Sequence, residues 1–157
     1  MTATKVIGES VKQTNRTFIK SYVEDYAKAI TENYRRYHLN TLNGNLHGNY
    51  PEYAREQLDA IENGTANLMK FKVYTGKRYY KIVQQEFETW EKSRNYGKYA
   101  DGLVHCFVDK ETGDVYKPAS WSAPAKHIRF TFQNVDHLKF LLNPDNVGWA
   151  GGYLYIR

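Results

Sequence analysis

The sequence has one cysteine, no long apolar run and only a small excess of positive charge, and each shortage excludes a class of protein. A single Cys among 157 residues excludes an internal disulfide framework and any zinc site made of several cysteines. No apolar run approaches about 18 residues, and the N-terminal segment has no long apolar stretch. We therefore expect no membrane span and no signal peptide, and the chain is predicted to be a soluble cytoplasmic protein without a membrane partner.

Motifs for cofactors and metals are also missing. No glycine-rich fingerprint lies between a predicted strand and a helix, and no P-loop Lys-Ser/Thr pair occurs. The segment 109–114 has three carboxylates beside a glycine but lacks the length and closing Glu of an EF-hand, so we interpret it as a hairpin turn. The histidines do not have the spacing of zinc ligands. We expect no metal and no cofactor.

The length predicts one domain that buries its own core without disulfides or a structural metal. Residues 1–15 are polar and small, so we expect a flexible N-terminal arm before a single globular domain over residues 16–157. Apolar and aromatic side chains then recur at three- and four-residue spacings, which predicts an amphipathic helix over 16–38 with a Tyr-rich face. After a loop of Asn and Gly over 40–49, Pro51 begins a second, shorter helix.

The remainder of the chain is predicted to form a sheet. Alternating apolar residues indicate strands, and Asn134 is a suitable N-cap for a short helix after them. Residues 84–102 are interpreted as an excursion between strands, and 118–125 as an ordered loop. The expected strands cover residues 69–74, 78–83, 103–108, 114–117, 127–132 and 153–156. Helices followed by hairpins predict an α+β fold, in which N-terminal amphipathic helices pack on a small, mainly antiparallel sheet.

The positive charge is concentrated in one short segment. Residues 70–81 hold five cations, three tyrosines and no acid, and their charge equals the net +5 of the whole chain. Cations with interleaved aromatic rings can hold a phosphate backbone and stack bases. A solvated hairpin whose lysines protect a sheet edge would have the same composition. The cations of this segment are Lys70, Lys72, Lys77, Arg78 and Lys81.

A second segment, 117–129, gathers polar and cationic groups around one tryptophan. Trp121 is expected to plug the sheet while the flanking prolines shape a corner. The cations of this segment are an open question: together with His127 they either bind an anion or phosphate or are simply solvated. If they bind phosphate, they extend the basic patch with Lys117, Lys126 and Arg129.

His105 and Cys106 are neighbours on a predicted strand, where adjacent side chains point to opposite faces. We therefore expect no nucleophile–base pair from their adjacency, and interpret Cys106 as a small buried hydrophobe and His105 as a core or boundary histidine. An alternative hypothesis is a small metal-independent nuclease or phosphodiesterase. It requires His105, His127 and Lys126 to converge in one cleft.

Several segments of the C-terminal half resemble small hypothetical proteins of tailed bacteriophages. These segments are Tyr79–Val83, Val104–Lys110, Thr112–Trp121, Ala123–Lys126 and Gly152–Tyr155. The resemblance implies a phage or prophage origin, and hence a location in the host cytoplasm or the virion. It carries no known activity, so no catalytic residue is transferred.

Together these observations favour a non-enzymatic phage accessory protein that binds a macromolecule of the host or the phage. Nucleic acid is the first candidate partner, through the basic segment 70–81. The alternative is a virion or subunit-interaction component, in which the Tyr-rich helix face binds a second subunit and the chain forms a homo-oligomer.

Overall fold

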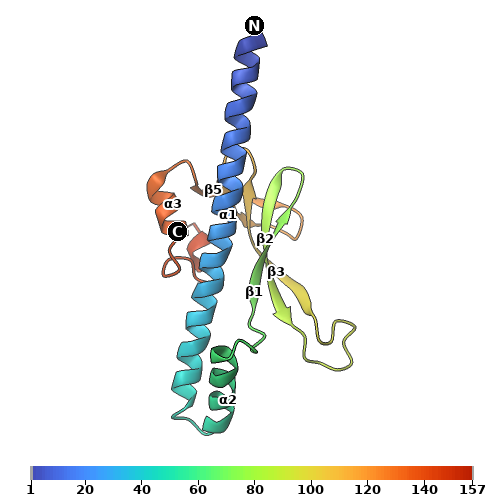
Figure 1. Cartoon of the computed structure of the whole chain (residues 1–157), viewed down its shortest axis with the longest axis vertical. Coiled ribbons are helices and arrows are strands. Elements are labelled where there is room, and N and C mark those ends of the chain that lie inside the picture. The colour runs from blue at the N-terminus through green and yellow to red at the C-terminus, as the bar shows by residue number, and fades with distance from the viewer. Residues whose placement is uncertain (1, 157) are drawn as a thin grey trace.

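The structure, a computed structural model, describes residues 2–156, with side chains described from Arg16 onward. It confirms the α+β fold: the long N-terminal helix packs on a five-stranded antiparallel sheet whose strands follow one another in chain order, and the second helix packs on the first (Figure 1). The helices are α1 (Thr2–Asn45), α2 (Pro51–Glu62), α3 (Val135–Leu141) and the short 3-10 helix η1 (Gly152–Leu154). The strands are β1 (Lys70–Thr75), β2 (Tyr79–Phe87), β3 (Tyr99–Asp109), β4 (Asp114–Pro118) and β5 (Pro124–Thr131).

Helix α1 is longer than predicted at both ends. It begins at Thr2, so the segment expected to form a separate arm is helical from that residue, and it continues to Asn45 through part of the expected loop. No proline occurs before Pro51, so no residue in this stretch forces the helix to stop. The Asn and Gly residues near its end cost at most about 1 kcal/mol each, which packing can offset. Within residues 2–156, no helix is long and apolar enough to cross a membrane.

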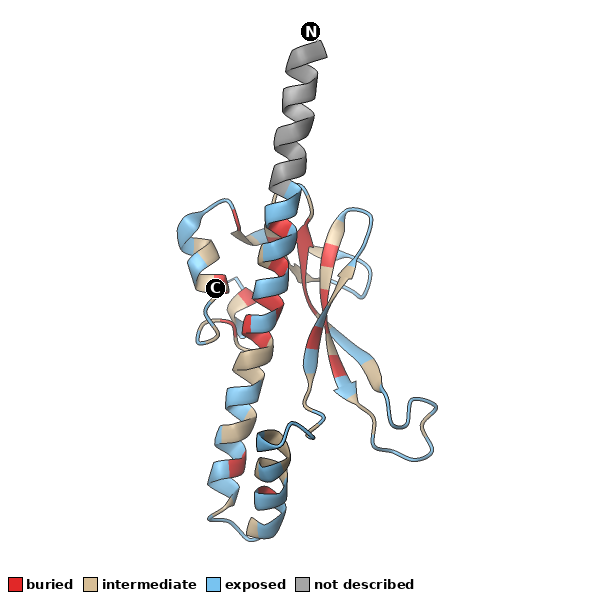
Figure 2. Ribbon diagram, viewed as in Figure 1, coloured by how far each residue is buried: buried red, intermediate tan, exposed pale blue. Residues whose placement is uncertain are grey.

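The Tyr-rich stripe of α1 forms the hydrophobic core with one face of the sheet. Figure 2 shows the buried residues gathered in the middle of α1 and on the strands that face it. Rings also pack at the edges of the stripe, where Tyr22 contacts Phe132 and Tyr34 contacts Trp149. The middle of the stripe is therefore occupied within the chain, whereas Phe18 and Tyr37 near its ends are exposed. Its buried members are Ile19, Val23, Tyr26, Ala27 and Ile30, and they pack with Phe71, Ile82, Cys106, Val108 and Val115 of the sheet.

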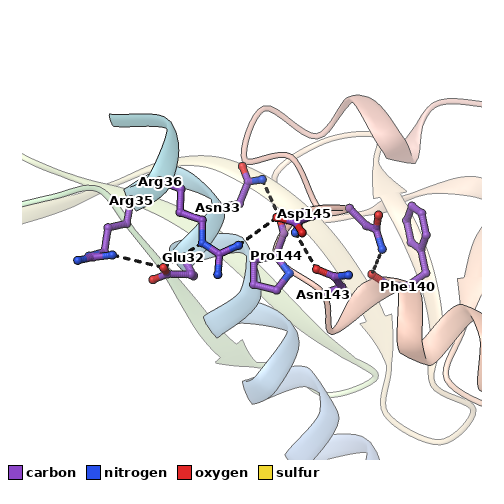
Figure 3. A network of polar contacts seen from close by, with 9 residues as sticks. Glu32, Asn33, Arg35, Arg36, Phe140, Asn143, Pro144 and Asp145 are labelled. Atoms are coloured by element: carbon purple, nitrogen blue, oxygen red, sulfur yellow. Dashed lines mark hydrogen bonds and ion pairs between the residues drawn. The ribbon is translucent and has the colours of Figure 1, made fainter. Parts of the chain in front are cut away.

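A polar network joins α1 to the segment after α3 (Figure 3). The side-chain amide of Asn33 donates to the carbonyl oxygen of Pro144 at 2.7 Å, and its oxygen accepts from the backbone N–H of Trp149 at 3.0 Å. Arg36 forms an ion pair with Asp145 at 3.0 Å. Because Asn33 satisfies one donor and one acceptor of the C-terminal segment, it fixes that segment against the helix.

The sheet extends further than the sequence indicates. Strands β2 and β3 continue into the expected excursion, which shrinks to the connection between Phe87 and Tyr99. Strand β5 begins at Pro124, inside the expected loop, which is possible because a proline at the first position of an edge strand removes no ladder bond. The predicted terminal strand over 153–156 is wrong, because the chain there forms η1 instead.

Other local predictions are confirmed. Helix α2 begins at Pro51, and the Asn134 side chain caps α3 by accepting from two backbone N–H groups. The turn after β3 is a tight hairpin connection in which Gly113 has a φ of 75°. The Asp109 carboxylate accepts the backbone N–H groups of Glu111 and Thr112, which explains the acidic residue at this turn.

A bulge between β2 and β3 corrects the expectation for His105 and Cys106. Ile82 pairs with Cys106 while the next residue, Val83, pairs with Val104, so His105 is an extra residue in β3. Both side chains consequently face the helix side of the sheet, and both are buried. The alternation rule fails here because a bulge breaks the two-residue period.

Candidate functional site

A row of paired residues crosses the sheet on the face opposite α1. Tyr74 pairs with Lys81, Lys81 with Phe107, and Phe107 with Tyr116. Phe71 of β1 belongs to the helix-side core, so Tyr74, three residues later on the strand, points to the other face. The row places aromatic rings on both sides of one lysine, on the sheet face that α1 leaves uncovered.

A pocket of about 460 Å³ opens at this row. The β1–β2 turn forms one wall, and the segment between β4 and β5 forms another, so the basic hairpin and the Trp121 loop share a single site. The pocket is lined by four aromatic side chains, three cations and one carboxylate among its residues. These are Tyr74, Tyr79, Phe107 and Trp121, then Lys77, Arg78 and Lys81, and finally Asp101.

Lys81 joins the two walls. Its Nζ donates to the carbonyl oxygen of Trp121 at 2.9 Å and lies 4.0 Å from the centroid of the indole ring. It also lies 5.9 Å from the ring centroid of Phe107. A cation over an aromatic face at this distance contributes about 0.5–2 kcal/mol, depending on solvent exposure. Lys81 therefore has a structural role, because it holds the Trp121 loop against β2.

The Trp121 loop is a tight turn between the paired prolines Pro118 and Pro124. The Ser120 hydroxyl accepts from the backbone N–H groups of Ser122 and Ala123, which closes the turn. This geometry carries Trp121 outward, and its side chain is 47% exposed. The expectation that Trp121 plugs the sheet is wrong: β4 and β5 are already paired on either side of the loop, and the ring instead forms a wall of the pocket.

Three of the five cations of the basic segment, Lys77, Arg78 and Lys81, line the pocket, and the other two lie further along β1. Lys77 and Arg78 are exposed in the turn between β1 and β2, where the Arg78 Nε lies 3.7 Å from the carboxylate of Asp109. Lys72 and Lys70 follow on the same face of β1 as Tyr74, since they precede it at two-residue intervals. The Nζ of Lys72 lies 4.9 Å from the ring centroid of Tyr74, and that of Lys70 lies 3.9 Å from the ring of Tyr99.

The three cations proposed to extend the patch are arranged differently. Arg129 donates to the carbonyl oxygen of Leu154 at 2.7 Å, and the Lys117 Nζ lies 4.8 Å from the ring centroid of Tyr155. Both therefore hold the C-terminal segment and are not among the residues that line the pocket. Lys126 and His127 are exposed on β5.

Asp101 is a pocket residue that the sequence reasoning did not identify. Its Oδ1 accepts from the hydroxyl of Tyr74 at 2.8 Å and from the side-chain amide of Gln85 at 2.7 Å. The bond from Gln85 is the main cause of a lowered pKa for Asp101, and the same carboxylate raises the pKa of Tyr74 by accepting its hydrogen bond. Asp101 was missed because it lies in the segment interpreted as an excursion, where no strand alternation was assigned.

Residues 6–156 match the model of a Family of unknown function (DUF7717). The chain belongs to this family. Neither the curated proteins nor the solved structures include a match to the chain. The pocket described above lies wholly within the part of the chain that the DUF7717 match covers.

The histidine required by the nuclease hypothesis is enclosed in the DUF7717 core. The Nε2 of His105 lies 2.7 Å from the hydroxyl of Tyr153, its ring packs edge-on against Phe71, and the side chain is buried. Burial lowers the pKa of His105 to about 4. His127 and Lys126 are on the exposed surface of β5 and are not among the contacts of His105, so the geometry does not provide the shared cleft that this hypothesis needs.

Cys106 belongs to the same buried network. The hydroxyl of Tyr153 lies 2.5 Å from that of Tyr26, and Tyr26 belongs to the same buried core cluster as Cys106. Burial raises the pKa of this thiol to about 12. A reactive cysteine needs a lowered pKa and access to solvent, so Cys106 is a structural residue. In the described part of the chain, no group of three or more His, Cys, Asp or Glu is placed to hold a metal ion.

Proposed function

We propose that the chain binds single-stranded nucleic acid in the pocket between the basic hairpin and the Trp121 loop. The observation that carries the proposal is that these two segments, about 40 residues apart in the sequence, form one site on the open face of the sheet. Aromatic walls and adjacent cations are the two components with which proteins hold unpaired nucleotides.

The aromatic residues favour a single strand over a duplex. A base must expose its face to stack on a side chain, and the bases of a duplex are stacked on one another. Trp121 is about half exposed, so part of its surface is accessible to a ligand. Stacking of this kind contributes about 1–3 kcal/mol per base, which exceeds the contribution of a typical exposed charge pair.

The cations supply the sequence-independent part of the binding. Lys77 is exposed and forms no ion pair among the described residues, and Arg78 is only loosely paired with Asp109. Both are thus able to contact phosphates next to a stacked base. Two or three such contacts predict a slope of about −1.4 to −2 for the logarithm of the binding constant against the logarithm of the salt concentration.

The biological setting remains the one that the sequence resemblance suggests. A phage-encoded protein that binds single strands without cleaving them acts as an accessory factor in the cytoplasm of the host. The pocket lining contains no histidine or cysteine, and the function proposed here is binding without cleavage.

Fluorescence anisotropy with labelled single strands of about 12 nucleotides, as DNA and as RNA, tests the proposal at roughly 20 mM salt. We expect binding to single strands, weaker binding to the matching duplex, and partial quenching of the tryptophan emission. Lys77→Ala should weaken binding and reduce the salt slope by about 0.7. The matched control is Lys20→Ala, an exposed lysine of α1, which should bind as the wild type does.

Two results would overturn the proposal. One is no detectable binding of any DNA or RNA at low salt, where phosphate contacts are strongest. The other is an equal loss of affinity in the Lys77 and Lys20 variants, which would mean that binding is diffuse and independent of the pocket.

A further inference from the structure

The pocket contains one feature that phosphate binding does not explain. Asp101 is the one carboxylate among its lining residues, and it lies on the same sheet face as the cations of β1 and β2. A negative charge in this position repels a nucleic-acid backbone. It therefore weakens sequence-independent binding unless a ligand makes use of it.

Asp101 is held in one orientation by two neighbours that also bond each other. The Gln85 side-chain amide donates to Asp101 Oδ1 at 2.7 Å and to the Tyr74 hydroxyl at 3.2 Å, while that hydroxyl donates to the same Oδ1 at 2.8 Å. Gln85 is only 7% exposed, so the group that orients the carboxylate is itself buried in the sheet. The arrangement fixes Oδ1 and leaves Oδ2 without a hydrogen-bond partner among the described residues.

We propose that Asp101 makes this pocket selective for guanine, a proposal that rests on the function proposed above. An ionised carboxylate accepts hydrogen bonds and cannot donate one. Guanine presents two adjacent donors on its Watson–Crick edge, the N1–H and the 2-amino group. Adenine and cytosine place a ring acceptor beside their amino group, and thymine and uracil place a carbonyl on each side of their N–H. Only guanine offers Oδ2 two donors without an acceptor between them.

The rest of the pocket is consistent with this assignment. Trp121 and Tyr74 supply aromatic surface for a purine, and Lys77 and Arg78 are next to them for the adjoining phosphates. The edge of an unpaired base is the surface that proteins read in single-stranded nucleic acid. Asp101 is thus a specificity-determining residue, and Gln85 is its positioning residue.

The test compares oligothymidylates of about nine nucleotides that carry one central thymine, guanine, inosine, adenine or cytosine. We expect the guanine strand to bind about tenfold more tightly than the all-thymine strand, with inosine between them because it lacks the 2-amino donor. Asp101→Asn keeps an oxygen for Tyr74 and Gln85 but replaces Oδ2 with an N–H donor. This variant should lose the preference for guanine while binding the all-thymine strand at least as tightly as the wild type.

Each outcome separates the two proposals. Equal binding of all five strands, or a preference for another base, overturns the guanine assignment and leaves single-strand binding intact. No binding of any strand overturns the proposed function and this inference together. A purely structural Asp101 predicts that Asp101→Asn weakens every strand equally or keeps the guanine preference, and either result overturns the assignment. Tyr74→Phe, which removes one of the two bonds that orient Asp101, should reduce the preference without abolishing binding, and an unchanged preference would likewise count against it.

Discussion

Protonation of His105 should govern the stability of this fold in mild acid. The side chain is buried between β3 and the C-terminal segment, and its burial lowers its pKa from about 6.5 to about 4. Above pH 6.5 the imidazole is neutral in both the folded and the unfolded chain. Between pH 6.5 and 4 only the unfolded chain gains the proton, so the free energy of unfolding falls as the pH falls, and the loss is complete below about pH 4.

The size of this effect follows from the shift. A difference of one in pKa corresponds to about 1.4 kcal/mol, so the fall in the pKa of His105 from 6.5 to about 4 removes roughly 3 kcal/mol of stability over this range. That is a large share of the free energy of unfolding of a typical domain, which is about 5–15 kcal/mol. Urea titrations followed by circular dichroism at several pH values between about 7.5 and 4 measure it directly.

His105→Gln isolates the contribution of this residue. The variant should be less stable than the wild type near neutral pH, because the contacts with Tyr153 and Phe71 are altered. The difference in free energy between the two proteins should then shrink by about 3 kcal/mol as the pH falls to 4. His127→Gln, at an exposed position of β5, is the control. This variant keeps His105, so its free energy of unfolding should fall with pH as that of the wild type does. A gap between wild type and His105→Gln that stays constant with pH would refute the reasoning.

Two further substitutions test the packing that holds the site in place. Gly113→Ala should destabilise the fold by about 1–2 kcal/mol or more in the same urea assay, because its φ is 75° and an added Cβ would lie 2.9 Å from the Cβ of Phe132. Gly64→Ala is the control, because Gly64 has a similar φ but no atom near the position of an added Cβ, so only the backbone strain remains. Equal losses of stability in the two variants would contradict a clash with Phe132. Tyr153→Phe should cost about 2–4 kcal/mol, since it leaves the hydroxyl of Tyr26 and the Nε2 of His105 without their shared partner; a loss under 1 kcal/mol would contradict this network.

The parts of the fold that could be predicted are those encoded by local periodicity. The stripe from Ile19 to Ile30 is visible in the sequence because a buried helix face requires apolar residues at fixed intervals. The extension of α1 to Asn45 is not visible, because Asn and Gly favour turns locally and only packing overrides them. The bulge at His105 is likewise invisible, since an extra residue in one strand is defined by the strand opposite it.

The two segments that form the site could each be predicted from the sequence, but their contact with each other could not. The basic segment and the Trp121 loop are each distinctive in the sequence, but the contact between Lys81 and Trp121 joins positions far apart in the chain. No local sequence pattern encodes which strand a distant loop will contact. The contact between the basic segment and the Trp121 loop is therefore visible only in the structure. No feature of the sequence marks Asp101, because its place in the pocket depends on the pairing of β3 with β2, which sets Asp101 opposite Gln85.

The location of the charge changes what kind of binding the pocket supports. The net charge of +5 equals the charge of the basic segment. Two of its cations already have partners, because Lys81 donates a hydrogen bond to the Trp121 carbonyl oxygen and Arg78 lies near the Asp109 carboxylate. Asp101 offsets a further part of the positive potential. If the pocket binds a single strand as proposed, these contacts leave fewer cations for phosphates than the net charge suggests, and we expect a modest salt dependence. Under the proposed function we expect stacking on the aromatic walls to contribute more than any single phosphate contact, so substitution of Trp121 should weaken a single-strand complex more than substitution of any one lysine.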